Sequence, residues 1–339
     1  MRNLGVFIGR RLLITVPMLL IVSILTFVIL RMLPSDPVAM IVGINRTPER
    51  VEFVTAQLGL DKPLVEQFVI WMGNVLQGDL GTAWHTGQAV TTDLAARIPA
   101  SVELAFLALL IGVPGGVATG VIAARYRDRF ADFGLRFSSL LAIATPEFLF
   151  GIFAIWLFFA VLNWAPAPLG RIEFGISPPE AITGLYIVDS VLTRNTEALV
   201  SSLRSIALPA ISLGVILAGG FQRFTRATMV ESLSSDAVLS SRGHGLPNRL
   251  VFYKYSLKQA LLVVVPVFGI VVAYAIGGLV AVERIFSWPG VGRYALEAVS
   301  RADLNAVQGF ILFSVVLYVA LNLFVDIVQA IIDPRIEYR

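Results

Sequence analysis

The chain lacks cysteine altogether and has only two histidines among its 339 residues. The absence of cysteine excludes disulfides and thiolate metal sites. The two histidines, His85 and His244, lie far apart in the sequence, and neither has metal-ligand spacing around it. The sequence therefore predicts no metal site.

Charge is also scarce. Only 14% of the residues are charged, 57% are hydrophobic, and the mean hydropathy is +0.81. Several uncharged runs reach the roughly 20 residues that a helix needs to cross a bilayer, so the composition excludes a soluble globular protein. The basic pI does not indicate nucleic acid, because the net charge is only +3 and the basic residues flank apolar runs. A multi-pass protein in a lipid bilayer is expected.

Motifs for nucleotide chemistry are missing too. No G-x-x-x-x-G-K-[ST] phosphate loop occurs anywhere, so this chain is not expected to bind ATP or to need a cofactor. An intramembrane enzyme would need a nucleophile with its base, or paired carboxylates, within the apolar runs. No such set is visible, and we expect no catalytic residues.

Six apolar stretches are long enough to be transmembrane helices, which predicts an all-α fold. The first follows a basic start and is too long for a signal peptide, so we expect it to be retained as an anchor. The expected spans are residues 12–33, 101–124, 137–162, 206–224, 260–282 and 306–328.

The distribution of Lys and Arg predicts the orientation. With the N-terminus inside, the inner segments hold more than half of the 26 basic residues in about half the length of the outer ones. The positive-inside rule therefore places both termini in the cytoplasm. The expected parts are the N-terminus with span one (1–33), a sizeable external segment (34–100), a core of spans two to six (101–332) and a cytoplasmic tail (333–339).

The external segment contains one amphipathic piece, "PLVEQFVIWMGNVL". Its apolar residues recur at helical spacing, which predicts a helix lying on the outer surface or against a neighbouring subunit. The residues expected on its apolar face are Leu64, Phe68, Trp71, Val75 and Leu76.

A polar, basic insert at residues 234–260 separates two apolar runs on the cytoplasmic side. "DAVLSSRG" predicts a short helix, and Gly245 and Pro247 then break it. After the break, apolar residues at helical spacing continue into the fifth span. Helix, glycine break and helix would suit a groove on a partner protein. The alternative is a loop whose basic charges only maintain topology.

This insert resembles the "EAA" loop of importer-type ABC transporter permeases, in which a glycine separates two short helices that dock into the ATPase subunit. The match places the family glycine at Gly245 and the acid at Asp236, and the second half, "YSLKQAL", is the closer one. Within a coupling loop at 225–260, the resemblance assigns ATPase contact to Asp236, Arg242, Gly245, Leu246, Arg249, Lys254 and Lys258. The sequence departs from the family pattern at Ala237, Leu239, Ser240, Ser241, Gly243 and His244.

The resemblance extends along nearly the whole chain. "RRLLITVPMLLIVSILTFVILRMLPSDP", "LGLDKPLVEQFVIWMGNVLQGDLGTAW", "VERIFSWPGVGRYALEAVSRADLNAVQG" and "NLFVDIVQAIIDPRIEYR" are similar, in order, to segments of dipeptide and oligopeptide permeases. The chain thus resembles the first (B-type) permease subunit of the peptide/nickel/opine importer family.

That resemblance implies the type I ABC importer permease fold in a prokaryotic plasma (inner) membrane, with this chain forming half of the translocation pathway. It implies a heterodimer with a second permease, one or two ATP-binding subunits that hydrolyse ATP, and an external solute-binding protein. The implied substrates are di- or oligopeptides, with nickel, glutathione, and opines or sugars as alternatives.

Within the spans, the most unusual residue is Glu147 in "IATPEFLFG". A carboxylate at mid-depth is costly unless it faces water or a partner. Glu147 could line the pathway and attract a cationic substrate, such as a peptide's amino terminus. Alternatively, Pro146 bends the helix, and a protonated Glu147 bonds to a freed carbonyl or to the second subunit.

Two glycine-containing features have alternatives of their own. Gly112, Gly116 and Gly120 recur every four residues, so the second span could pack closely on another helix. "FSWPGVGR" could be an aromatic turn at the membrane interface, or it could dip towards the pathway as an external gate. The gate residues would be Trp288, Pro289, Gly290 and Gly292.

An ion-coupled secondary transporter or channel is the rival class. It would also explain six spans. It would, however, normally place more ionisable groups at mid-depth than Glu147 alone, and it would not need the helix–glycine–helix loop.

Overall fold

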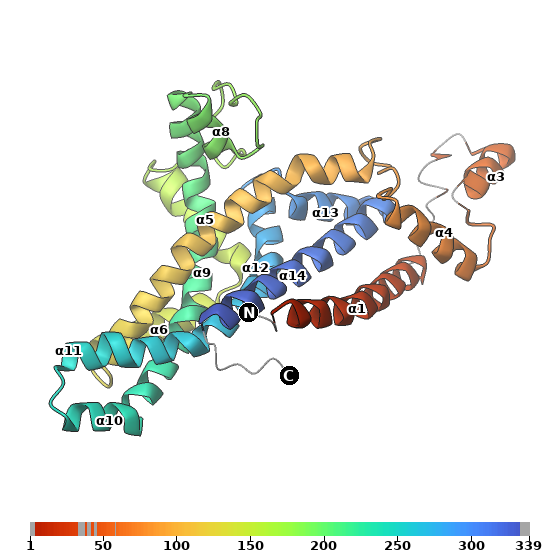
Figure 1. The fold of residues 1–339 in the computed structure, drawn as a ribbon. Coiled ribbons are helices and arrows are strands. Elements are labelled where there is room, and N and C mark those ends of the chain that lie inside the picture. Colours follow the sequence, from red (N-terminus) through yellow and green to blue (C-terminus); the bar gives the residue numbers. More distant parts are fainter. Residues whose placement is uncertain (1–3, 33–37, 39–41, 44–45, 58, 333–339) are drawn as a thin grey trace. The chain divides into compact units, whose positions relative to one another are not determined.

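The computed structural model describes residues 4–32, 38, 42–43, 46–57 and 59–332 (Figure 1). Apart from one isolated β-bridge between Thr82 and Ala89, the regular structure of these residues is helical, as predicted. The tail expected at 333–339 lies outside the described residues.

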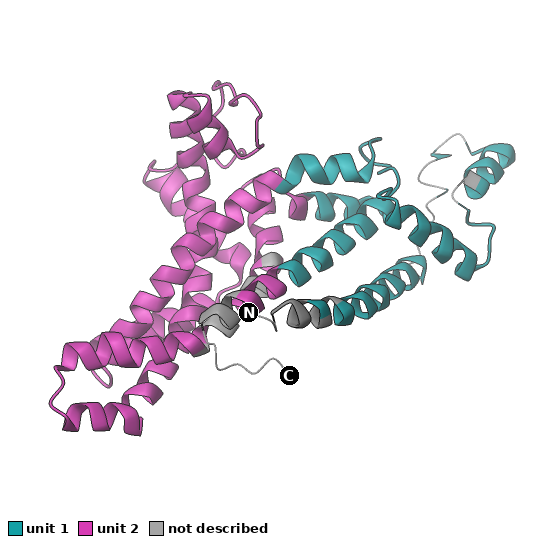
Figure 2. Cartoon of the chain, in the orientation of Figure 1, with its two compact units in different colours: residues 1–98, 294–320 teal, residues 99–293, 321–339 magenta. Residues whose placement is uncertain are grey.

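The chain divides into two compact units (Figure 2). Unit 1 comprises residues 1–98 and 294–320, and unit 2 comprises residues 99–293 and 321–339. Three helices run from one unit into the other: α5 (Val90–Arg125), α13 (Val291–Ser300) and α14 (Leu304–Ile332).

Unit 1 also contains α1 (Leu4–Met32), α3 (Pro48–Gln57) and α4 (Leu64–Leu76). The amphipathic helix predicted in the external segment is α4, and the ring of Phe27 lies 5.4 Å from that of Phe68 and 5.6 Å from that of Trp71. Leu64 and Leu76, at the ends of the predicted apolar face, are 60% and 80% exposed in this single chain, so their placement on the outer surface or against a neighbouring subunit stays a prediction. The aromatic residues of the face pack on α1.

The remaining helices belong to unit 2. Its core lies where α5, α9 and α12 meet, and buried residues of this core include Leu104, Leu217 and Val282. The helical elements confined to this unit are α6 (Phe130–Ala144), α7 (Glu147–Ala154), η1 (Ile155–Val161), α8 (Tyr186–Leu192), α9 (Thr196–Leu233), α10 (Asp236–Gly243), α11 (Asn248–Leu250), η2 (Val251–Ser256) and α12 (Leu257–Ile285).

The glycine repeat of α5 packs on α9, as the sequence suggested. A β-carbon at Gly112 would lie 2.9 Å from the carbonyl oxygen of Gly214, and one at Gly116 would lie 2.6 Å from that of Ala218. Only glycine permits backbones to approach so closely. The repeat therefore fixes the α5–α9 contact at the centre of unit 2.

Four described helices are long and apolar enough to cross a membrane, and a bent pair makes up to five. The span expected at 260–282 falls within the 29-residue α12, several of whose side chains lie outside the described residues. The four helices are Leu13–Met32, Val90–Arg125, Thr196–Leu233 and Leu304–Ile327.

Two of these helices are longer than the expected spans. α5 begins eleven residues before the expected start at 101, because the ion pair of Asp93 with Arg97, at 2.6 Å, supports a polar first part. α9 extends beyond 206–224 at both ends, and the side chain of Asn195 caps its first turn by accepting a hydrogen bond from the Ala198 amide.

The third span, expected at 137–162, is bent at Pro146, as one of the two alternatives for this segment predicted. α6 begins at Phe130, and the helix axis turns by 106° between Phe130–Ala144 and Glu147–Val161. Pro146 has no N–H to donate, and Thr145 before it adopts an extended backbone with ψ of 123°. The proline therefore breaks the span and places Glu147 at the start of a new helix.

Candidate functional site

The first half of the coupling loop forms the predicted helix α10, Asp236–Gly243. It ends in two hydrogen bonds, from the Gly245 amide to the Arg242 carbonyl (2.9 Å) and from the Leu246 amide to the Ser241 carbonyl (3.3 Å). This pattern is a Schellman motif with Gly245 at the C′ position, where its φ of +76° is the left-handed conformation that favours glycine. Pro247 follows and prevents the helix from continuing. The predicted break at Gly245 and Pro247 is confirmed.

The charges of α10 complement its helix dipole. Asp236 lies in the first turn and Arg242 in the last, each at the end where its sign is stabilised. The ring of His244 also contacts the end of the helix, since its Nδ1 lies 2.8 Å from the Ser240 carbonyl oxygen. This short helix therefore has favourable local electrostatics although most of its surface is exposed.

The second half of the loop is continuous with the transmembrane helix. α11, the π-helical segment η2 and α12 follow one another, and the residues at both junctions, Val251 and Leu257, have right-handed helical backbones. The predicted helix running into the fifth span is therefore confirmed. One helical rod extends from Asn248 to Ile285.

Buried contacts attach this loop to the end of α9. Val238 and Val251 are almost completely buried. The hydroxyl of Ser232 donates to the carbonyl oxygen of Ser256 at 3.2 Å and contacts the side-chain oxygen of Gln259 at 3.0 Å. The loop is thus anchored on one side only.

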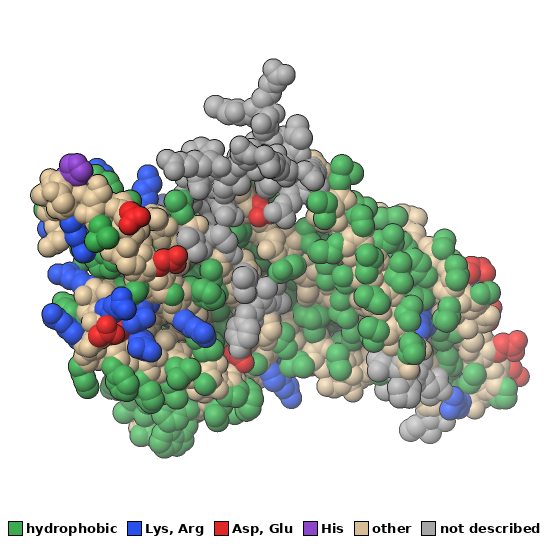
Figure 3. Space-filling model, turned by 90° about the horizontal axis from the view of Figure 1, so that it is seen from below, with side chains coloured by type: hydrophobic (Ala, Val, Ile, Leu, Met, Phe, Trp, Pro, Cys, Tyr) green, Lys and Arg blue, Asp and Glu red, His purple; other side chains and the backbone are tan. Residues whose placement is uncertain are grey.

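The other side of the loop is open. Leu246 is half-buried, and basic side chains gather around α10 and α11 (Figure 3). The exposed candidates are Asp236, Arg242, Gly245, Arg249, Lys254 and Lys258.

A nearby ion pair was not predicted from the sequence. Arg226 of α9 donates two hydrogen bonds to the carboxylate of Asp132, which is 1% exposed, at 2.6 and 2.7 Å. A bidentate pair of this kind fixes the start of α6 against α9. The two residues are 94 positions apart in the sequence, and no local pattern indicates such a pairing.

Glu147 is half-buried in the first turn of α7. A β-carbon added at Gly278 of α12 would lie 3.2 Å from its Cγ, so the carboxylate side chain lies against a glycine of the helical rod. No described residue gives the carboxylate a hydrogen bond or an ion pair. The structure brings Glu147 to α12 and leaves Pro146 exposed at the break.

The 286–293 loop, which follows α12, is held by a buried carboxylate that the sequence did not single out. Glu283 is fully buried and accepts hydrogen bonds from the Ser101 hydroxyl (2.5 Å) and the Arg293 amide (2.9 Å). The same hydroxyl accepts a bond from the Val291 amide at 2.9 Å. An acid five positions before Trp288, in an otherwise apolar stretch, was the only local signal.

The candidate gate residues lie in this segment, where neighbouring residues pack closely around them. Trp288 is 1% exposed, and its indole N–H donates to the Ala100 carbonyl at 2.8 Å. A β-carbon at Gly290 would overlap the Glu283 carboxylate, and one at Gly292 would lie 2.8 Å from the backbone of Val280. Both glycines are required by close packing.

A second buried ion pair orders the segment that precedes α8. Arg171 donates to Glu103 of α5 at 2.6 Å, and its guanidinium lies 3.6 Å from the ring centre of Tyr186. Glu103 also accepts a hydrogen bond from the Ile187 amide at 2.8 Å. This cluster joins three sequence regions in unit 2 and provides a fixed surface on the segment between η1 and α9.

Asp189 of α8 is a local organiser of the same segment. Burial alone would raise the pKa of Asp189, but hydrogen bonds from the Thr183 hydroxyl and from the amides of Thr183 and Gly184 lower it below its ordinary value. The carboxylate is therefore ionised at neutral pH and holds the turn before α8.

Among the described residues, no group of three or more acidic or histidine side chains could hold a metal ion.

Comparisons with known proteins agree with the helical architecture. A family described as "Binding-protein-dependent transport system inner membrane component" matches residues 116–338, and its N-terminal companion matches residues 4–105.

Relatives match along almost their whole length. The chain is 36% identical to the di/tripeptide transport system permease protein of Pseudomonas aeruginosa, covering 98% of this chain and 99% of that protein. It is 33% identical to the dipeptide transport system permease protein of Alkalihalophilus pseudofirmus (97% and 98%) and 32% identical to the oligopeptide transport system permease protein of Bacillus subtilis (99% and 100%). The chain therefore belongs to the family of inner-membrane components of binding-protein-dependent transport systems.

Proposed function

We propose that this chain is a permease subunit of an ATP-driven importer of di- or oligopeptides. In this proposal it forms half of the translocation pathway and is coupled to ATP hydrolysis through the loop around Gly245. The observation that carries the proposal is the continuous helical rod from Asn248 to Ile285, which begins in the exposed coupling loop and continues as α12.

The rod offers a mechanism for energy coupling. Movement of α10 by an ATPase subunit would displace the N-terminal end of the rod, since α10 packs on η2 and each of the two has a buried valine, Val238 and Val251. The rod contacts Glu147 at Gly278 and ends next to Glu283 and the 286–293 loop. A rigid displacement would therefore change the surroundings of both candidate pathway positions together.

Peptides are the substrate class supported by the relatives, whose names specify di/tripeptides, dipeptides and oligopeptides. In this role, Glu147 would attract the α-amino group of a peptide, because its half-buried carboxylate has no partner among the described residues. Among the alternative substrates, nickel ions and simple sugars have no α-amino group for this carboxylate to attract.

The proposed partners follow from the surfaces of the chain. The complex would contain one or two ATP-binding subunits, and the exposed basic loop would dock into one of them. An external solute-binding protein would deliver substrate. Both termini would then be cytoplasmic. A second permease would complete the pathway, with the exposed apolar residues of α7 and η1 facing it or lipid; these include Phe148, Ile152, Phe153 and Trp156.

The 286–293 loop is proposed as the external gate. Glu283 would set its closed position, and Trp288, Pro289, Gly290 and Gly292 would form its packed segment. Opening would require the Ser101–Glu283 hydrogen bond and the Trp288–Ala100 hydrogen bond to break or shift. A gate at the end of α12 could thus respond to motion that begins at the coupling loop.

Reconstitution of the complete transporter in proteoliposomes tests this function. ATP-dependent uptake of a labelled dipeptide is expected, with competition by unlabelled di- and oligopeptides but not by nickel ions, glutathione or sugars. Glu147→Gln should raise the concentration of peptide needed for half-maximal uptake, and a peptide with an acetylated amino terminus should lose this difference. Uptake driven by a proton or sodium gradient without ATP would instead support the ion-coupled class.

A further inference from the structure

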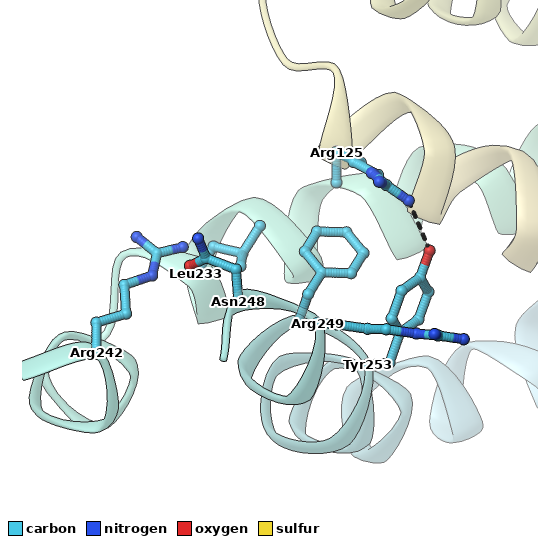
Figure 4. Close-up of a pocket in the computed structure, with 8 residues that line it drawn as sticks. Arg125, Leu233, Arg242, Asn248, Arg249 and Tyr253 are labelled. Carbon is cyan, nitrogen blue, oxygen red and sulfur yellow. Dashed lines mark hydrogen bonds between the residues drawn. The ribbon is translucent and has the colours of Figure 1, made fainter. Parts of the chain in front are cut away.

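A basic pocket in unit 2 lies between the coupling loop and the ends of α5 and α9 (Figure 4). Its volume is about 750 Å³, which is large enough for a small-molecule headgroup. The residues that line it are Ala124, Arg125, Leu233, Arg242, Asn248, Arg249, Phe252 and Tyr253.

Three of the eight lining residues are arginines and none is acidic. Among the described residues, none of these three guanidinium groups forms an ion pair. Arg125 donates a hydrogen bond to the Tyr253 hydroxyl at 3.0 Å, whereas Arg242 extends from α10 on the side of the pocket where Leu233 and Asn248 lie (Figure 4). The pocket therefore presents uncompensated positive charge from three separate elements, and its chemistry suits an anion.

The position of the pocket relative to the spans indicates which anion. Arg125 is the last residue of α5 and Leu233 the last of α9, and both helices are apolar enough to cross the membrane. Arg125 directly follows the span expected at 101–124, so this wall of the pocket is expected at the level of the lipid headgroups, whereas Leu233 lies nine residues beyond the span expected at 206–224. Ala124, Leu233 and Phe252 add an apolar wall beside the guanidinium groups.

We propose that this pocket binds the phosphate headgroup of an acidic phospholipid. Arginines placed between helix ends at the membrane surface suit such headgroups, with hydrogen bonds to phosphate oxygens and with the glycerol region against the apolar wall. Because Arg242 belongs to α10, Asn248 and Arg249 to the start of the rod, and Arg125 to α5, one bound lipid would join all three elements. The lipid would restrain the coupling loop against the membrane surface.

The consequence for transport rests on the proposed function of the coupling loop, whereas binding of the lipid does not. Acidic phospholipid would favour the position of α10 and the rod that transmits ATPase movement. Substrate-stimulated ATP hydrolysis should therefore rise with the fraction of acidic lipid in the bilayer. Lipid binding and coupling are measured separately for this reason.

The first measurement is native mass spectrometry of the complete transporter, purified in mild detergent and supplied with phosphatidylglycerol, cardiolipin or phosphatidylcholine. We expect retention of phosphatidylglycerol and cardiolipin, and roughly 30-fold weaker binding when two guanidinium charges are removed in Arg125→Gln/Arg249→Gln. Arg129→Gln is the matched control, because Arg129 is exposed in the turn after α5 but does not line the pocket. It should bind lipid as the wild type does.

The second measurement is substrate-stimulated ATP hydrolysis in nanodiscs containing increasing phosphatidylglycerol in phosphatidylcholine. Activation should be weaker in Arg125→Gln than in the wild type or Arg129→Gln. Equal lipid retention by the double variant and the control would overturn the proposal, as would full replacement of the lipid effect by inorganic phosphate. Loss of ATPase subunits from the double variant with lipid retention unchanged would also overturn it and assign the arginines to ATPase docking. Gly245→Val separates the two proposals. If this variant retains lipid normally but loses coupling, both proposals are supported. If lipid binds selectively but coupling does not depend on Gly245, only the proposed function is rejected.

Discussion

Gly245 combines a left-handed backbone, φ +76°, with open space around the position where a β-carbon would be. Its requirement is therefore conformational, and asparagine should replace it better than alanine, because asparagine tolerates the left-handed region. We expect uptake to decrease in the order Gly245, Gly245→Asn, Gly245→Ala and Gly245→Val, with a destabilisation of the loop of about 1–2 kcal/mol for the last two.

The measurement is ATP-driven peptide uptake, normalised to the amount of protein in the membrane. Immunoblotting should show equal insertion of all variants, since Gly245 lies outside the spans. If alanine supports more uptake than asparagine, the position needs a small residue at a docking surface and the conformational explanation fails.

Glu283 gives a prediction at the other end of the rod. Glu283→Gln replaces one carboxylate oxygen with an NH₂ group, which donates hydrogen bonds and accepts none. One of the two donors, the Ser101 hydroxyl or the Arg293 amide, therefore loses its acceptor oxygen. Leaving one buried group unpaired costs about 1–3 kcal/mol. Faster hydrogen exchange at the Arg293 amide and reduced uptake are the expected results.

Ser101→Ala provides the partner variant for this test. If the two residues act as a pair, the double variant should lose less stability than the two single losses added together. Glu180→Gln, at an exposed site, is the control and should leave both exchange and uptake unchanged. Strictly additive losses would show that Glu283 and Ser101 act independently.

At the scale of elements, the break between α6 and α7 depends on Pro146. Pro146→Ala restores an N–H that can donate to a carbonyl one turn earlier, so the 106° turn should become smaller and Glu147 should move from Gly278. Because the chain has no cysteine, spin labels can be placed at Phe133→Cys and Trp156→Cys without removing native thiols. The distance between the labels should increase in Pro146→Ala, and uptake should fall. An unchanged distance would mean that packing against α12 alone sets the turn.

Local patterns explain which elements were predictable. α10 was predicted to the residue because Gly245 and Pro247 mark its end, and α4 was predicted from its helical spacing. Hydropathy failed for α9, whose polar Ser201 and Gln222 are buried within the helix, and its length depends on the cap at Asn195. The bend in the third span could be anticipated from Pro146, because the residue before proline favours an extended backbone, but the hydropathy that set the limits of the span does not measure this preference.

The candidate site shows the same division between local and distant information. The glycine and charge pattern of the coupling loop is contiguous, so the loop could be located from the sequence. The carboxylate of Glu283 acts on Ser101, 182 positions away, and Glu147 meets Gly278 across the fold. Pairings at such separations follow from the packing of α5, α7 and α12 and have no signature in a single sequence.

At the scale of the whole molecule, the chain is a transport component of the inner membrane and not a catalytic subunit. The proposal that this chain transports while separate subunits hydrolyse ATP is consistent with the sequence, which has no phosphate loop. It is also consistent with a helical rod that begins in an exposed basic loop. In the proposed function, energy enters from an ATP-binding partner. The side of the membrane that carries the coupling loop determines where that partner binds.

The absence of cysteine allows this orientation to be measured directly. Single cysteines at Arg127, in the turn after α5, and at Ser177, in the segment before α8, occupy exposed positions. A membrane-impermeant maleimide should label Ser177→Cys on intact cells and Arg127→Cys only in inverted vesicles. A third site, Ser241→Cys on α10, should be labelled in inverted vesicles that lack the ATPase subunits and protected when those subunits are present. Labelling of Arg127→Cys on intact cells would reverse the proposed topology. Equal labelling of Ser241→Cys with and without the ATPase subunits would leave the topology unchanged and show that α10 is not part of the docking surface.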